Sequence, residues 1–223
     1  MTTTRWTSAA FVAAGLAFLM FPVLRPWPDE TTATTGLALA FASDRWVIAH
    51  LSGILGLGLL APALLGLRTL LAGTAGAAVS TWALVTAWAG AGLSSLYFGA
   101  EIFGIRTLAE AALPTSDAGT MLTRVEALRT QPWAVTLFGA GLFLLAAAGV
   151  LAAAAVMRAG AARGSWARWA GLPLALGLFL LLPQFYGGPE IRMAHGVLVA
   201  VGCVLLAVAV RPLGAAARDL RTR

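Results

Sequence analysis

Three ionisable side chains lie in long apolar segments of this sequence, and their types can transfer protons. Glu101 stands near the end of an apolar run that begins near Val79, and the two histidines, His50 and His195, each follow an alanine within an apolar stretch. Ionisable groups at such positions are candidates for function by default. A carboxyl group in apolar surroundings holds its proton more firmly than in water, so Glu101 could act as a general acid.

Further polar and aromatic side chains are expected at the same level along the molecule as Glu101. Glu190 and Tyr97 join Glu101, His50 and His195 as candidate catalytic residues. Aromatic ring faces in this layer could stabilise a carbocation. The candidate substrate-binding residues are Trp46, Phe98, Phe103, Arg106, Gln184, Phe185, Tyr186 and Arg192. The simpler interpretation is that the charged residues flank the membrane interface and extend to water.

The composition indicates which environment surrounds these residues. Of the 223 residues, 60% are hydrophobic and 11% are charged, whereas a soluble domain has roughly 25% charged residues. A helix needs about 20 apolar residues to cross a bilayer. Six apolar runs approach or exceed this length, at residues 6–24, 46–67, 79–105, 133–157, 166–186 and 194–210. They show no sustained alternation, which favours helices over a barrel. We therefore expect one all-α integral membrane domain, a bundle of six transmembrane helices over residues 1–223.

The distribution of charge predicts how this bundle is oriented. All 15 basic residues are arginine, and nine of them fall on the side of the two termini. The positive-inside rule then predicts a multi-pass plasma-membrane protein with both termini in the cytoplasm. Eight of the nine acidic residues fall on the outer side, where we expect polar function to concentrate. The arginines form no patch interleaved with exposed aromatic residues, so the expected partners are the bilayer and a lipophilic small molecule, not nucleic acid.

The longest connection between predicted spans, residues 106–131, lies on the outer side and has a helical segment at 117–132. Asp117 could cap this helix, and Met121, Val125 and Leu128 share one face of it. We expect a short amphipathic helix there. It could lie on the bilayer surface, or it could cover an outward-facing cavity as a lid.

Three segments carry a resemblance to known proteins. WVIAH (46–50), YFGAEIFGIR (97–106) and PQFYGGPEIRMAHG (183–196) are similar to segments of small actinobacterial six-span membrane proteins. The bundle with an acid in each half also resembles, in architecture, the membrane-bound cyclases of meroterpenoid and indole-sesquiterpene pathways, whose fungal members have seven spans. That resemblance implies acid-initiated cyclisation of an isoprenoid without a metal or other cofactor, with Glu101 and Glu190 as the paired acids.

Two other classes of function are compatible with the same residues. His50 and His195, on two helices at one level, could be axial ligands of a b-type haem, or they could join Glu101 in a metal site. The chain could also be a small-molecule transporter or a sensor subunit. Transport is less favoured by the pattern, because the polar residues gather at one side and not at the membrane midplane.

Overall fold

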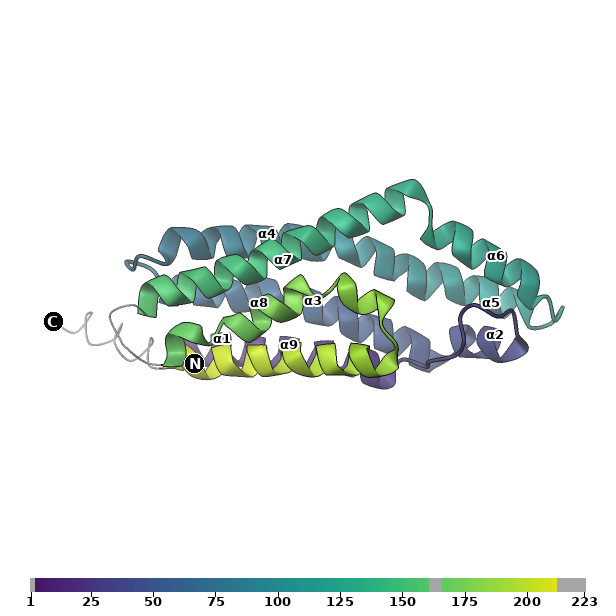
Figure 1. Cartoon of the computed structure of the whole chain (residues 1–223), viewed down its shortest axis with the longest axis horizontal. Helices are drawn as coiled ribbons and strands as arrows, with labels where there is room; N and C mark the ends of the chain where they lie inside the picture. Colours follow the sequence, from purple (N-terminus) through teal and green to yellow (C-terminus); the bar gives the residue numbers. More distant parts are fainter. Residues whose placement is uncertain (1–2, 161–165, 212–223) are drawn as a thin grey trace.

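The computed structural model describes residues 3–160 and 166–211, and the regular secondary structure in this part of the chain is entirely helical (Figure 1). The α-helices are α1 (Thr3–Leu24), α2 (Thr35–Ala42), α3 (Asp44–Leu70), α4 (Ala77–Gly99), α5 (Arg106–Ala112), α6 (Ala118–Arg129), α7 (Pro132–Gly160), α8 (Leu172–Phe179) and α9 (Pro189–Ala209). Between α4 and α5 the chain forms a π-helix, η1 (Ala100–Ile105), and two 3₁₀ turns, η2 (Trp166–Trp169) and η3 (Pro183–Tyr186), flank α8.

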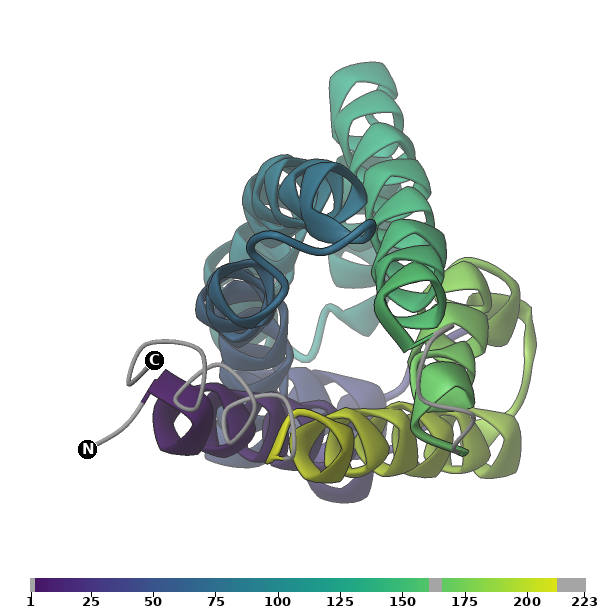
Figure 2. The ribbon, with the colours of Figure 1, turned by 90° about the vertical axis from the view of Figure 1, so that its left-hand side faces the viewer.

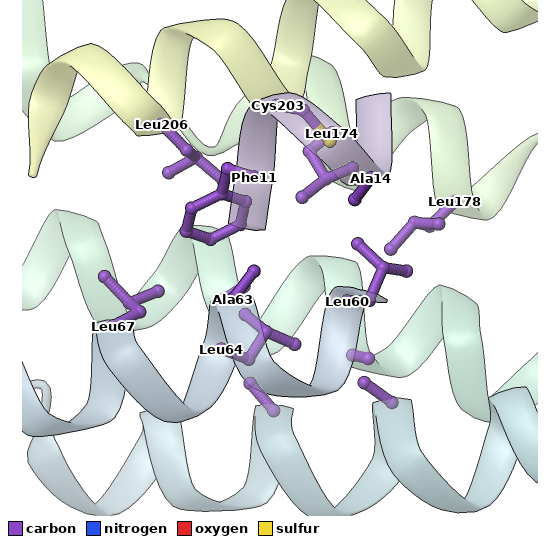
Figure 3. Close-up of a cluster of buried hydrophobic side chains, with 14 of the residues drawn as sticks. Phe11, Ala14, Leu60, Ala63, Leu64, Leu67, Leu174, Leu178, Cys203 and Leu206 are labelled. Carbon is purple, nitrogen blue, oxygen red and sulfur yellow. The ribbon is translucent and has the colours of Figure 1, made fainter. Parts of the chain in front are cut away.

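Six elements pack side by side in a closed ring (Figure 2). Helix α1 packs against α3 and α9, α3 against α4, α4 against α7, α7 against α8, and α8 against α9. Large apolar side chains fill the interior between α1, α3, α8 and α9, where Phe11 and Leu60 are fully buried (Figure 3). Among the described residues, five helical segments are long and apolar enough to cross a membrane: Thr3–Leu24, Asp44–Leu70, Ala77–Ala112, Pro132–Ala159 and Pro189–Ala209. The fold therefore indicates a multi-pass membrane protein.

The fifth apolar run, residues 166–186, does not form the continuous transmembrane helix expected from its hydropathy. Helix α8 has eight residues, about 12 Å of helix, which is too short to cross a bilayer. Pro173 lies in its first turn, and Pro183 begins η3. A proline lacks the backbone N–H that would continue a helix and disfavours helical geometry in the residue before it. The run still lies beside α9 in the opposite direction (Figure 1), so it completes the ring as an interrupted element.

The third apolar run continues well beyond the bundle. Together α4, η1 and α5 form a helical segment of 36 residues, roughly 54 Å long against a hydrocarbon core of about 30 Å. Its far end packs with α2 and α6 into a helical cap at one end of the molecule (Figure 1). The cap (α2, α5 and α6) has its own hydrophobic cluster, formed with residues of α3 and η1: Leu37, Ala38, Phe41, Trp46, Ile105, Ala109, Ala112, Met121 and Val125.

The amphipathic helix expected in the longest connection is present as α6. The Asp117 side chain accepts a hydrogen bond from the backbone N–H of Thr120 and so caps the helix. Met121 and Val125 are buried, and α6 packs against α5, α2 and η1. Because its apolar face is covered by the protein itself, α6 has the position that the lid interpretation requires.

Helices α4 and α7 approach each other closely through small residues. A Cβ atom placed on Gly141 would lie 2.5 Å from the Ser94 hydroxyl oxygen and 2.9 Å from the Gly90 carbonyl oxygen. A Cβ atom on Gly139, two residues earlier in α7, would have no such neighbour within 4 Å. Glycine at position 141 therefore permits the contact, as small residues commonly do between membrane helices.

Replacing Gly141 with alanine is expected to lower the temperature of unfolding, because overpacking a tight contact costs about 1–3 kcal/mol. Gly139→Ala is the matched control in the same helix, and there the higher helix propensity of alanine should leave stability equal or improved. The measurement is loss of the monodisperse gel-filtration peak of detergent-purified protein after heating. Equal unfolding temperatures for the two variants would contradict the close α4–α7 packing.

Candidate functional site

A cavity of about 320 Å³ lies where the ring of helices meets the cap. Its wall combines aromatic and aliphatic side chains with several ionisable groups. The lining residues are Phe21, Arg25, Glu30, His50, Tyr97, Phe98, Glu101, Arg129, Val135, Phe138, Leu182, Phe185, Tyr186 and Arg192. A concave, mainly apolar site with a few convergent polar groups is the usual form of a small-molecule site.

Glu101 is buried and is paired with an arginine from the cap. Its side chain is directed at Arg129 of α6, whose Nε donates to Oε1 at 2.8 Å and whose Nη2 donates to Oε2 at 2.9 Å. This two-pronged geometry is the strongest way in which an arginine binds a carboxyl group. Arg106, five residues after Glu101, does not pair with it; it forms ion pairs with Asp44 and Glu110 outside the cavity. The charge in this apolar segment is thus balanced by a residue distant in sequence.

The π-helix η1 contains Glu101 and affects which side chains point inward. Single π turns within α-helices occur frequently at functional sites, where the extra residue changes the direction of the following side chains. In η1, Glu101, Ile102 and Ile105 are buried, whereas Phe103 is 72% exposed. The helix continues as α5 into the cap, so the same segment supplies the acid and supports α6.

Arg129 also binds a second carboxylate. Its Nη1 donates to Oε2 of Glu30 at 2.8 Å, and the other oxygen of Glu30 accepts from Arg25. Burial opposes ionisation of Glu30, but the guanidinium groups of Arg25 and Arg129 outweigh it and hold the pKa of Glu30 below its ordinary value. Burial likewise opposes the charge on Arg129, and Glu101 and Glu30 more than offset it, raising the pKa of Arg129. Arg25, Glu30, Arg129 and Glu101 thus form one chain of alternating charge.

His50 faces Glu101 across the cavity wall. Its Nε2 lies 3.8 Å from Oε2 of Glu101, and its Nδ1 lies 2.7 Å from the carbonyl oxygen of Trp46. Because a carbonyl only accepts, the hydrogen on Nδ1 is assigned to this bond, and the lone pair of a neutral His50 is then on Nε2. The Trp46 indole donates to the main-chain oxygen of Glu101 at 2.8 Å. The imidazole and the carboxyl group are therefore held 3.8 Å apart, beyond direct hydrogen-bond distance, and either could exchange a proton with a molecule bound beside them.

Several other predicted residues lie around this pair. The ring of Tyr97 stacks on Phe138 with 4.3 Å between ring centroids, and Phe98 packs edge-on against Phe21. Trp46 is fully buried behind His50. The predicted substrate-binding residues that line the cavity are Phe98, Phe185, Tyr186 and Arg192.

Other predicted site residues are not brought into this cavity. The Nε2 atom of His195 is 2.8 Å from the carbonyl oxygen of Gly177, and His195 and Gln184 line a smaller neighbouring cavity. Glu190 is exposed, as is Phe103. The expected convergence of His50 and His195 with Glu101 is thus met by His50 alone. The sequence places all of them at one level, but the direction of each side chain depends on rotation about its helix axis.

Three charged residues of the site, Arg25, Glu30 and Arg129, were not among the predicted ones. Glu30 could have been found from the excess of acidic residues on the outer side of the predicted bundle. Arg129 lies in the connection expected to be helical, on the segment for which a lid was considered. Only the packing of α6 against η1 makes it the partner of Glu101.

The two histidines were also considered as ligands of a haem or a metal ion. In the part of the chain that the structure describes, no three His, Cys, Asp or Glu side chains are grouped so as to hold a metal ion. Nε2 of His195 is directed at a backbone carbonyl and not at the cavity that His50 lines. A shared haem or metal site for the two histidines would require His195 to turn.

Comparison of the chain with family models, curated proteins and solved structures finds no significant match. The assignment of function therefore depends on the chemistry of the site, since a fold alone does not define an activity.

Removing the Arg129 side chain should destabilise the protein, because Glu101 and Glu30 would remain buried without this guanidinium. Breaking a buried pair by deleting one partner costs about 3–5 kcal/mol. Arg129→Met should therefore lower the free energy of unfolding far more than Arg106→Met, whose ion pairs are more exposed and worth about 0–1 kcal/mol. Denaturant titration in mixed micelles measures both.

The double variant Glu101→Gln/Arg129→Met should recover part of this loss, since glutamine carries no charge to leave unpaired. A double-mutant cycle should give a coupling of about 0.5–3 kcal/mol. Strictly additive effects would show that the pair makes no net contribution in the membrane protein.

Proposed function

We propose that this chain is a membrane-embedded enzyme that transfers a proton to and from a lipophilic substrate at the Glu101–His50 pair. The observation that carries the proposal is the placement of this pair, with 3.8 Å between Oε2 and Nε2, in the wall of a cavity that is otherwise largely aromatic and aliphatic. Paired titratable groups in a pocket are a common arrangement for acid–base catalysis.

The reaction we favour is acid-initiated cyclisation of an isoprenoid-like substrate. The pair, carrying one proton, would give it to a carbon of an alkene, whose π electrons form the new C–H bond and leave a carbocation. Ring closure would move the positive charge along the substrate, and the pair would then remove a proton to form the product alkene. The product is an isomer of the substrate, so no further reactant is needed.

The surrounding residues support this assignment in two ways. The rings of Phe98, Phe138 and Phe185 line the cavity, and their faces can stabilise a carbocation. Both oxygens of Glu101 accept hydrogen bonds from Arg129, so we assign the first proton transfer to His50 Nε2, with Glu101 as the counter-ion of the imidazolium before the transfer.

We further propose that the interrupted element 166–186 is the fifth of six membrane crossings and that the cap lies on the outer side. The closed ring supports six crossings, because α8 and its flanking turns occupy one position between α7 and α9. The arginine distribution supports a cytoplasmic location for both termini in the plasma membrane.

The orientation can be tested with single cysteines in a Cys203→Ser background. Thr120 in α6 and Ala75 in the turn before α4 are both exposed, so cysteines there should react readily. A membrane-impermeant maleimide added to intact cells should label Thr120→Cys and should label Ala75→Cys only after the cells are opened. The reverse pattern would place the cap in the cytoplasm.

Catalysis can be tested by incubating the detergent-purified protein with a panel of prenylated compounds and searching by mass spectrometry for isomeric products. Glu101→Gln keeps the shape of the side chain but removes its negative charge and its ability to accept a proton. Turnover should fall by about 10²–10⁴-fold, the usual contribution of an acid–base group.

Glu110→Gln is the matched control, because it removes a carboxylate from the same end of the molecule and outside the cavity. It should retain turnover. A monodisperse Glu101→Gln protein with wild-type turnover would end the assignment of Glu101 to the reaction.

A further inference from the structure

The charged groups of the cavity do not balance. Three guanidinium groups, those of Arg25, Arg129 and Arg192, line it with two carboxylates, Glu30 and Glu101. Without the proton that the Glu101–His50 pair carries, three positive charges against two negative ones leave one positive charge in a partly buried site, and that proton adds a second. An uncompensated charge in an apolar setting is costly unless a partner is supplied.

Among the described residues, the guanidinium group that has no carboxylate partner is that of Arg192 in α9. Its Nε donates to the Gly187 carbonyl at 3.2 Å, and its Nη2 donates to the Phe185 carbonyl at 2.7 Å. These bonds satisfy part of its donor capacity but bring no negative charge. Within residues 3–160 and 166–211, Arg192 forms no ion pair.

Arg25, which lies beside Arg192, lacks hydrogen-bond acceptors for part of its guanidinium group. It is 5% exposed, and its Nε and Nη1 atoms have no hydrogen-bond partner in the described part of the chain. Its guanidinium carbon lies 4.5 Å from the centroid of the Trp27 ring, and that of Arg192 lies 5.2 Å from the same ring. Two like charges therefore flank one indole, an arrangement that an anion between or beside them would stabilise.

Apolar surface continues from this positive region into the bundle. A second cavity of about 30 Å³ adjoins the first and shares Phe21, Phe98, Phe185 and Arg192 with it. Beyond them its wall includes Leu57 and Leu142. A molecule with its charged end at the arginines would have its apolar part against the aromatic side chains that the two cavities share.

We infer that the cavity binds an amphiphile with one anionic head group, a carboxylate or a phosphate, held by Arg192 beside Arg25, and an apolar tail packed against Phe21, Phe98 and Phe185. The inference depends on the proposed function only in taking this cavity as the substrate site, and it adds the chemical class of the substrate. The head group supplies the negative charge that the site lacks, and the tail covers the aromatic wall.

The test is equilibrium binding of radiolabelled dodecyl phosphate to the protein in phosphatidylcholine nanodiscs, with empty nanodiscs as background. Unlabelled laurate should compete, whereas dodecanol and dodecyltrimethylammonium should compete about 10- to 100-fold less well, because they offer no charged acceptor. Inorganic phosphate should compete poorly, since it has no tail to bury. Equal competition by dodecanol would exclude an anionic head group, and equal competition by phosphate would indicate a site for a free anion.

Substitutions of Arg192 test whether its guanidinium group binds the head group. Arg192→Gln should weaken binding of dodecyl phosphate by about 10- to 100-fold, and Arg192→Lys, which keeps the charge, should weaken it less. Arg106→Gln, which removes an arginine at the same end but outside the cavity, should leave binding unchanged. Wild-type affinity in Arg192→Gln, or equal loss in folded Gln and Lys variants, would overturn the role of the Arg192 charge.

The competition series uses the wild-type protein, so it tests the charge of the head group even if Arg192→Gln fails to fold. Binding needs no turnover, which separates the two proposals. If the protein prefers neutral amphiphiles and Glu101→Gln still loses turnover, the anionic head group is wrong and the proposed acid–base reaction is not affected.

Discussion

The contact of Arg129 with Glu101 and Glu30 is the interaction on which the arrangement of the site depends. It joins three separate segments: α6 of the cap, the π-helix at the end of the third span, and the connection after α1. Each charge would be costly to bury alone, and each is stabilised by the others. The position of α6 in the cap and the pairing of both carboxyl groups of the cavity therefore have a common cause.

The sequence predicted the class of fold well because hydropathy and helix length are nearly sufficient for it. The all-α bundle follows from the requirement that backbone groups in hydrocarbon be paired within a segment. The continuity of the fifth element did not follow, since hydropathy measures how apolar a run is and not whether its backbone continues. Pro173 and Pro183 were the available signals that this run is interrupted. Packing between α7 and α9 determines where the interrupted run lies.

The sequence predicted the level in the bundle at which the site residues lie, but not the direction in which each side chain points. The rise per residue of a helix places Glu101 and His50 at one level, and the structure brings them together. The same reasoning placed His195 there, yet its ring is directed at the Gly177 carbonyl. The π-helix further changes the rotation of side chains near Glu101, and such a turn has no simple sequence signature. Arg129 is 28 positions from Glu101, so only the tertiary packing of α6 shows that they are partners.

The double role of Arg129 links the cap to the acid–base pair. Its Nη1 binds Glu30, and its Nε and Nη2 bind Glu101, so one guanidinium of α6 holds two carboxylates from different segments. The Glu101 oxygen that accepts from Nη2 is also the one that lies 3.8 Å from His50 Nε2. Any change in the position of α6 would therefore alter the surroundings of both carboxylates and of His50 together.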